Sequence, residues 1–105
     1  MPINLKTWLE ATGLKVAEDK FIKPPVLPYI VFSAVEGVYG ADNSNLLNRR
    51  QVTIELYSDL INPAAEKFVE DLLDAKTVNY SKGREWFASE SFFQTAYDFE
   101  ITERK

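Results

Sequence analysis

The amino-acid sequence predicts an α+β fold, in which an antiparallel sheet of about four strands carries two helices on one face, in the order α-β-β-α-β-β. Two observations predict it. A segment with the periodicity of an amphipathic helix, residues 62–75, lies in the middle of the chain. Strand-like segments rich in β-branched and aromatic residues precede and follow it, and a helix with one apolar face needs a sheet to cover.

Residues 62–75 carry the signals of a helix start and of an amphipathic helix. Asn62 is a good N-cap because its side-chain oxygen can accept a hydrogen bond from the first turn, and Pro63 suits the first helical position. The predicted inward stripe consists of Ala65, Phe68, Val69, Leu72 and Leu73. The residues predicted to face outward are Glu66, Lys67, Glu70, Asp71 and Asp74.

The first 28 residues predict one short helix and a connector. Residues 4–12 form the helix, with Asn4 as its cap, Trp8 on its apolar face and Gly13 as a left-handed stop. Residues 14–23 are mixed in character and fit either an irregular segment or a weak edge strand. Three prolines within residues 23–28 exclude helix and favour an extended connector.

Two strands are predicted on either side of a long loop. Residues 29–36 are dense in β-branched and aromatic residues, and residues 49–58 alternate between apolar and polar positions. The inner face of the second strand is formed by Val52, Ile54 and Leu56. Between the strands, residues 37–48 are rich in Gly, Asn and Asp, which predicts a projecting loop.

The end of the chain predicts two more strands. Residues 78–80 begin the third strand, residues 81–84 form a turn or bulge in which Gly83 is free to take a positive φ, and residues 85–89 continue it. Residues 91–102 form the longest strand, because apolar and polar positions alternate along it. Its apolar side is formed by Phe93, Thr95, Tyr97, Phe99 and Ile101.

Composition limits the classes of function. A chain of 105 residues forms one domain, residues 1–105. It contains no cysteine and no histidine, which removes Cys nucleophiles, disulfides, Ser-His-Asp triads and the usual zinc ligands. The net charge of −4 opposes binding to nucleic acid or anionic membranes, and no apolar run is long enough to span a bilayer. We therefore expect a soluble, non-enzymatic protein made in a cytoplasm, without metal or cofactor.

Two groups of charged residues could in principle form a functional site. Glu55 and Asp98 approach each other if their strands pair, but a solvated surface explains them better than an acid/base or Mg²⁺ site. A small basic patch for nucleic acid would consist of Arg49, Arg50, Lys82 and Arg84. The acidic excess opposes that role, and an arginine at the base of a loop more often pairs with a carboxylate of a neighbouring strand or subunit.

The aromatic residues are the more informative feature. Those that lie on or beside the predicted strands are Tyr29, Phe32, Tyr39, Tyr57, Trp86, Phe87, Phe92, Phe93, Tyr97 and Phe99. Helices on one face of a single sheet can bury only about half of this surface. A sheet whose second face is partly apolar usually meets another protein, so we expect the chain to associate with itself.

Several segments resemble a family of small tail proteins from siphophages and prophages of Gram-positive bacteria. The resemblance includes Leu-Pro-Tyr-Ile-Val-Phe at residues 27–32 and Tyr-Gly-Ala-Asp-Asn at residues 39–43. It continues through Val-Thr-Ile-Glu-Leu-Tyr at 52–57, the helix at 66–74, and Phe-Gln-Thr-Ala-Tyr-Asp-Phe-Glu-Ile at 93–101. These segments are structural rather than catalytic, and the resemblance covers nearly the whole chain from Leu5 onward.

The resemblance implies a tail-terminator or tail-completion protein with an α+β fold. Such proteins close into a ring, commonly of six subunits, that caps the tail tube and joins it to the head connector. The implied partners are other copies of the chain, the major tail protein and the head-completion or connector protein. The implied location is the virion tail, after assembly in the host cytoplasm. The net charge of −4 is compatible with a lumen through which DNA passes without being held.

No motif of that family assigns contact residues, so candidates for subunit or partner contacts come from position alone. They are Tyr39, Asp42, Asn43, Asn45, Leu46, Leu47, Arg49, Arg50, Trp86 and Phe92. A ring contact needs two different surfaces on each subunit, and the 37–48 loop and the apolar sheet face are the expected pair. The alternative is a small α+β ligand-binding or regulatory module that uses the apolar sheet face as the floor of a pocket.

Overall fold

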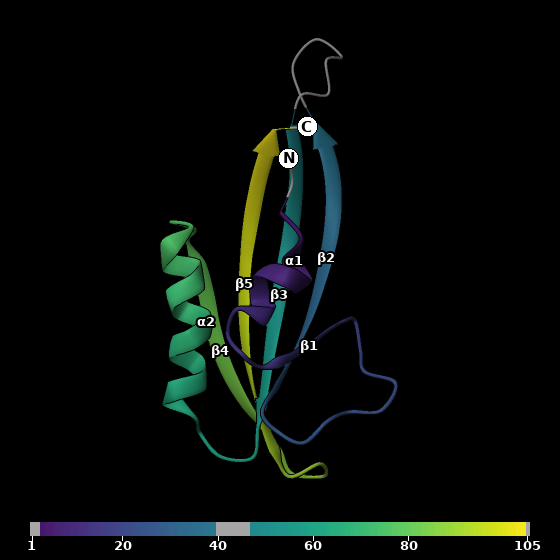
Figure 1. The fold of residues 1–105 in the computed structure, drawn as a ribbon, viewed down its shortest axis with the longest axis vertical. Helices are drawn as coiled ribbons and strands as arrows, with labels where there is room; N and C mark the ends of the chain where they lie inside the picture. Colours follow the sequence, from purple (N-terminus) through teal and green to yellow (C-terminus); the bar gives the residue numbers. More distant parts are fainter. Residues whose placement is uncertain (1–2, 40–46, 105) are drawn as a thin grey trace.

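The computed structural model describes residues 3–39 and 47–104, and their strands run side by side along the long axis in Figure 1. In chain order the elements are α1 (Leu5–Glu10), β1 (Lys15–Glu18), β2 (Tyr29–Tyr39), β3 (Leu47–Ser58), α2 (Pro63–Ala75), β4 (Tyr80–Phe87) and β5 (Phe92–Arg104). Neither helix in the described part of the chain is long and apolar enough to cross a membrane.

The described strands form one five-stranded sheet in the order β1-β2-β3-β5-β4. All neighbouring pairs are antiparallel except β1 and β2, which run parallel with Lys15 opposite Tyr29. The predicted mixture of helices and sheet is confirmed, but the prediction of about four strands in the order α-β-β-α-β-β is incomplete. The additional strand is β1, an edge strand within the 14–23 segment, whose character the sequence left open.

Both helices pack on the same face of the sheet. Side chains alternate between the two faces along each strand, and the apolar residues of the central strands gather on this face. We call this side the helix face and the opposite side the open face. The helix face and the two helices together bury Leu5, Leu9, Val16, Ile30, Phe32, Val52, Ile54, Leu56, Ala65, Val69, Leu73, Tyr97, Phe99 and Ile101. Trp8 of α1 closes one end of this core by an edge-to-face contact with Phe99, with ring centroids 6.2 Å apart.

The predicted helix caps are confirmed. Asn62 Oδ1 accepts a hydrogen bond from Ala65 N at 3.0 Å, and α2 covers Pro63–Ala75 as the sequence indicates. Asn4 Oδ1 likewise accepts from Thr7 N at 3.0 Å, although α1 ends at Glu10, two residues earlier than predicted. Gly13 follows with a φ of +84°, the left-handed conformation expected after a helix end.

The orientation of α2 differs from the predicted one. Glu66 was expected to face outward but is only 6% exposed, whereas Phe68, expected in the inward stripe, is 49% exposed. The helix buries Ala65, Val69 and Leu73, a narrow i, i+4, i+8 stripe that places Phe68 toward solvent. Glu66 turns toward the sheet because β4 presents two cations to it, as described below.

Two further predictions are wrong in detail. β2 extends to Tyr39, which pairs with Leu47 at the start of β3, so residues 37–39 and 47–48 of the expected loop belong to strands. Residues 40–46 of that expected loop lie outside the described residues. β4 runs without interruption from Tyr80 to Phe87, so there is no turn at 81–84, and Gly83 does not have a positive φ.

Candidate functional site

The ten candidate contact residues do not form one surface. Asp42, Asn43, Asn45 and Leu46 lie outside the described residues. Tyr39 and Leu47 pair as strand neighbours. Arg49 and Phe92 belong to the open face, at opposite ends of the sheet, whereas Arg50 and Trp86 belong to the helix face. Arg49 and Arg50 lie on opposite faces because successive side chains of a strand alternate between the two faces of the sheet. The alternation of residues 49–58 in the sequence already indicated this.

One end of the open face carries a row of aromatic rings. Tyr29 stacks on Tyr57 with ring centroids 5.2 Å apart, and Tyr57 meets Phe92 edge to face at 4.9 Å. The segment between β1 and β2 folds onto this row, because Phe21 packs edge to face on Tyr29 at 5.2 Å. As a result Tyr29 is only 9% exposed. The expectation that this apolar face is left for sister subunits is therefore corrected: the chain itself covers part of it.

A small cavity remains beside these rings. Its volume is about 190 Å³, and its lining includes Phe21, Pro24, Tyr29, Tyr57 and Phe92. Pockets for drug-sized ligands usually occupy roughly 300–1,000 Å³. The aromatic end of the open face is thus too filled to serve as the floor of a large ligand pocket.

The other part of the open face is polar. Thr53 donates a hydrogen bond to Asp98 at 2.6 Å, and Gln51 donates one to Glu100. Glu55 lies opposite Ala96, two residue pairs from Asp98, and accepts a hydrogen bond from Gln94 Nε2 at 2.9 Å. Each carboxylate thus has its own donor, and the described residues contain no cluster of acidic residues suited to a metal ion.

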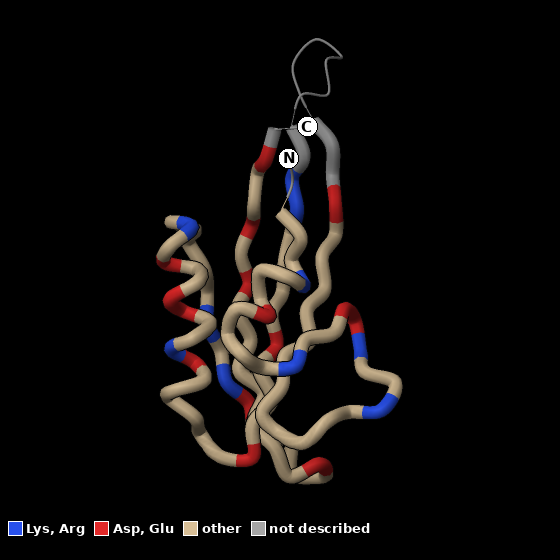
Figure 2. Tube along the Cα trace, viewed as in Figure 1, with Lys and Arg blue, Asp and Glu red and all other residues tan. Residues whose placement is uncertain are grey.

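The four candidate cations are divided among carboxylates instead of forming one basic patch. Figure 2 shows the acidic residues of α2 beside the basic residues of β4. Arg84 donates to Glu66 from Nε at 3.2 Å and from Nη2 at 2.7 Å. Lys82 contacts Glu66 at 2.9 Å and Glu70 at 2.7 Å. These ion pairs fasten α2 to the edge strand.

Burial by itself raises the pKa of the Glu66 carboxyl, but hydrogen bonds from Lys82 and Arg84, together with their charges, outweigh burial and hold that pKa below its ordinary value. A lowered carboxyl pKa stabilises the folded state above the unfolded-state value, near 4.5, and this contribution disappears as the pH falls further. The docking of α2 is therefore weakened by acid.

Glu66→Gln is expected to lower the free energy of unfolding by about 1–3 kcal/mol at neutral pH, because Arg84 and Lys82 lose their shared anion. The loss should shrink at about pH 3, where Glu66 of the wild-type protein is itself protonated. Urea denaturation at both pH values measures this. Glu85→Gln makes the same charge change at an exposed site of β4 and should have little effect. An equal loss for Glu66→Gln at both pH values would contradict the prediction.

Arg50 belongs to a second buried ion pair. Its side chain is 8% exposed and contacts Glu103 of β5, whose side chain is 13% exposed. The pair also holds the backbone of Ile3: Arg50 donates to Ile3 O at 3.1 Å, and Ile3 N donates to Glu103 Oε2 at 2.9 Å. The expected pairing of a loop-base arginine with a carboxylate on a neighbouring strand is confirmed for this residue.

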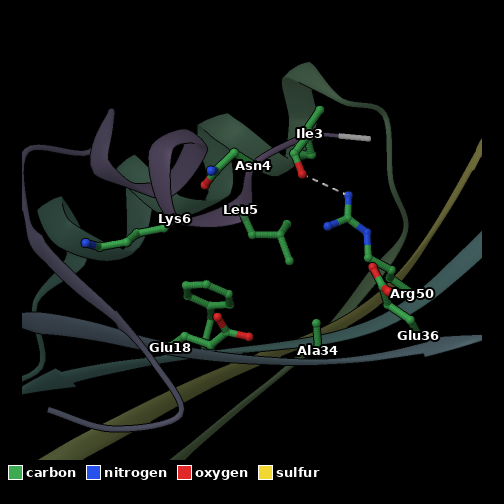
Figure 3. Close-up of a pocket in the computed structure, with 9 residues that line it drawn as sticks. Ile3, Asn4, Leu5, Lys6, Glu18, Ala34, Glu36 and Arg50 are labelled. Atoms are coloured by element: carbon green, nitrogen blue, oxygen red, sulfur yellow. Dashed lines mark hydrogen bonds between the residues drawn. The ribbon is translucent and has the colours of Figure 1, made fainter. Parts of the chain in front are cut away.

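Figure 3 shows a groove beside Arg50, between α1 and the edge of β2. Its volume is about 650 Å³, and its lining consists of Ile3, Asn4, Leu5, Lys6, Glu18, Phe32, Ala34, Glu36 and Arg50. The floor is apolar, carboxylates stand at Glu18 and Glu36, and Arg50 Nε is buried without a hydrogen-bond partner among the described residues. Sequence reasoning missed Glu18 and Glu36, because the groove exists only where β1 stops short of the full length of β2.

These features define a small α+β protein with one sheet face that carries no helix and a groove along a strand edge. No family model and no curated protein sequence matches the chain. Among solved structures, the fold is similar to that of a chain in the virion of a native gene transfer agent (GTA) particle, with a TM-score of 0.61 and 14% sequence identity. The similarity covers 92% of this chain and 84% of that chain, and at this identity it shows a shared fold.

Proposed function

We propose that the chain is a non-enzymatic structural protein of a phage or phage-like particle. In this role it assembles into a ring that ends the tail tube and joins it to the head connector. The observation that carries the proposal is the fold shared with a virion chain of a gene transfer agent, which extends over 92% of this chain. This role is also the one that the resemblance to siphophage tail proteins implies.

The chemistry of the chain supports a role in assembly. It has neither histidine nor cysteine, and its net charge of −4 suits a passage that does not retain DNA. In this proposal the partners are further copies of the chain, the major tail protein and the head-completion or connector protein. The protein would be found in the virion tail after assembly in the host cytoplasm.

The experiment that tests this role locates the chain in the particle. An epitope tag at its C-terminus, followed by immunogold electron microscopy of purified particles, is expected to label the head–tail junction. Deleting the gene should leave tail tubes that are not terminated and do not join heads. A plasmid copy of the gene should restore joined particles. A label elsewhere on the particle, or joined particles without the gene, would contradict the proposal.

A ligand-binding role is the second candidate, because the groove of about 650 Å³ beside α1 lies within the usual size range of ligand sites. It would use Arg50 and the carboxylates at Glu18 and Glu36 to hold a polar small molecule. A thermal-shift screen separates the two roles. A saturable rise in melting temperature that Glu36→Gln abolishes would favour a ligand site, whereas the assembly role predicts no such compound.

A further inference from the structure

β2 is covered on its outer side only at its start. β1 pairs with residues 29–32 of β2 and ends at Glu18, and in Figure 1 β2 continues well beyond the level of β1. Residues 33–39 of β2 pair with β3 on their inner side and have no strand on their outer side in the described part of the chain. We call this stretch the free edge of β2.

The backbone groups of the free edge are directed away from the sheet. Phe32 O accepts a hydrogen bond from Asp19 N at 2.7 Å, so the backbone groups of Phe32 point away from β3. Because these groups alternate with period two along a strand, Ala34 and Glu36 direct their N–H and C=O groups outward as well. Such a row of backbone groups is a template for another strand, which would continue the line of β1.

The groove of about 650 Å³ lies along the free edge, on the helix face. Figure 3 shows its lining, in which Ala34 and Glu36 come from β2, Glu18 comes from the end of β1, and Leu5 and Lys6 come from α1. Every second side chain of a strand added beside β2 would point into this groove. The free edge therefore offers space for side chains as well as partners for a backbone.

The groove contains two carboxylates that lack a counter-ion. Glu18 and Glu36 form neither an ion pair nor a side-chain hydrogen bond with another residue of the described part of the chain. The cations of the lining are engaged elsewhere, because Arg50 pairs with Glu103, and Lys6 lies near a carboxylate of its own helix. A positively charged side chain is therefore the group that complements this groove.

A side chain added beside Ala34 would lie between these two carboxylates. Glu18 stands opposite Phe32 at the end of β1, whose line the added strand continues, and Glu36 lies two residues beyond Ala34 on the same face. Diagonal neighbours on one sheet face are about 7–8 Å apart, which long side chains can span. Lysine or arginine at this position would therefore reach both carboxylates.

On the open face the free edge exposes an apolar side chain, because Val35 is 72% exposed. A strand added beside β2 would place a side chain against Val35, and apolar pairs across neighbouring strands stabilise a sheet. The matching segment thus directs basic side chains into the groove and apolar side chains to the open face. A second copy of the free edge does not match, because residues 33–39 contain no basic residue.

We infer that the free edge of β2 binds an extended segment of another protein in which basic residues alternate with apolar ones. Backbone hydrogen bonds with Ala34 and Glu36 hold this segment, as in other cases where a peptide adds a strand to a sheet edge. Its basic side chains contact Glu18 and Glu36, and its apolar side chains cover Val35. The inference goes beyond the proposed ring and does not depend on it.

The probe is the peptide acetyl-Val-Lys-Val-Lys-Val-Lys-Val-amide, titrated into the ¹⁵N-labelled protein. Saturable changes in amide chemical shift are expected along residues 33–36 and at Glu18, and not along β4. Two control peptides should bind much more weakly: one with glutamate in place of lysine, and one with the order Lys-Lys-Lys-Val-Val-Val-Val. No saturable change with the first peptide would overturn the inference, and so would equal binding of the glutamate peptide.

Two variants of Glu36 test the charge and the backbone separately. Glu36→Lys should weaken binding of the lysine peptide roughly tenfold, because an attraction becomes a repulsion. Glu85→Lys makes the same charge change at an exposed site of β4 and should leave the affinity unchanged. Equal effects of these two variants would contradict the inference.

Glu36→Pro removes an N–H that points outward, so it costs no hydrogen bond to β3, and proline is tolerated at such edge positions. It is expected to abolish the saturable shifts while the circular dichroism spectrum stays unchanged. Binding that persists in a folded proline variant would overturn pairing through this edge.

Discussion

Replacing Glu103 by alanine is expected to lower the free energy of unfolding by about 3–5 kcal/mol, a large part of the total for a domain of this size. The reason is that Arg50, 8% exposed at its side chain, would keep its charge in the core without a counter-ion. The variant also removes the acceptor for Ile3 N, so the segment before α1 loses one of its two backbone attachments to the sheet. Urea denaturation monitored by tryptophan fluorescence measures the loss.

Two variants separate the cost of an unpaired charge from the cost of lost packing. Arg50→Met combined with Glu103→Leu replaces the ion pair by apolar side chains, and most of the stability should return. Asp71→Ala removes an exposed pair with Lys67, whose atoms are 2.9 Å apart, and should lower the stability far less than Glu103→Ala. A Glu103→Ala variant as stable as Asp71→Ala would show that the Arg50–Glu103 ion pair does not stabilise the fold.

The same pair has a defined dependence on pH. Burial raises the pKa of the Glu103 carboxyl, but hydrogen bonds from Ile3 N and Arg50, with the charge of Arg50, outweigh it and hold that pKa below its ordinary value. The contribution of Glu103 is therefore complete above the unfolded-state value near 4.5 and decreases as the pH falls below it. Wild-type protein and Glu103→Ala should accordingly approach each other in stability in acid.

The helix α2 shows what local sequence can predict. Its cap at Asn62, its Pro63 start and its end at Ala75 were all predicted, because each signal involves residues within a few positions of one another. The side of α2 that faces the sheet was predicted less well. The partners of Glu66 are Lys82 and Arg84, which lie 16 and 18 positions further along the chain. Glu66 and Glu70 on one helix face, with cations alternating on a strand, were the available signal.

That signal was hidden by the misassigned turn at 81–84. Ser81, Gly83 and the charged residues around them have turn composition, and the period of two between Lys82 and Arg84 is visible only once the strand is recognised. Tertiary ion pairs with α2 override the weak strand propensity of this segment. β1 was left open for a related reason, since four residues carry too little periodicity to define a parallel edge strand.

The candidate contact residues illustrate a different limit. Surplus aromatic surface was predicted correctly as a feature of the second sheet face, but its cover by the segment around Phe21 depends on a contact that no local pattern encodes. Likewise, β2 beyond Phe32 and β5 beyond Phe99 have no outer neighbour among the described strands, because β1 and β4 stop there. Strand ends are the least predictable part of a sheet from sequence, so edge surfaces become visible only in the structure.

Tyr97→Ala is expected to have the other large effect, a loss of about 3–5 kcal/mol in the free energy of unfolding. Tyr97 is 0% exposed on the central part of β5, opposite Ile54 of β3, and its ring meets Tyr80 at a centroid distance of 5.7 Å. Truncation at this position leaves a cavity under α2 that its neighbours cannot fill without moving the helix.

Tyr97→Phe separates the ring from its hydroxyl group. Burial raises the pKa of Tyr97, and the hydrogen bond to Glu70 raises it further, so the phenol stays protonated and donates to Glu70 at 2.9 Å. Removing only this donor should cost about 1 kcal/mol, because Glu70 keeps Lys82 as a partner at 2.7 Å. Denaturation of both variants at neutral pH gives the comparison. A phenylalanine variant as unstable as the alanine variant would mean that the polar contacts beneath α2, and not the volume of the ring, hold this helix on the sheet.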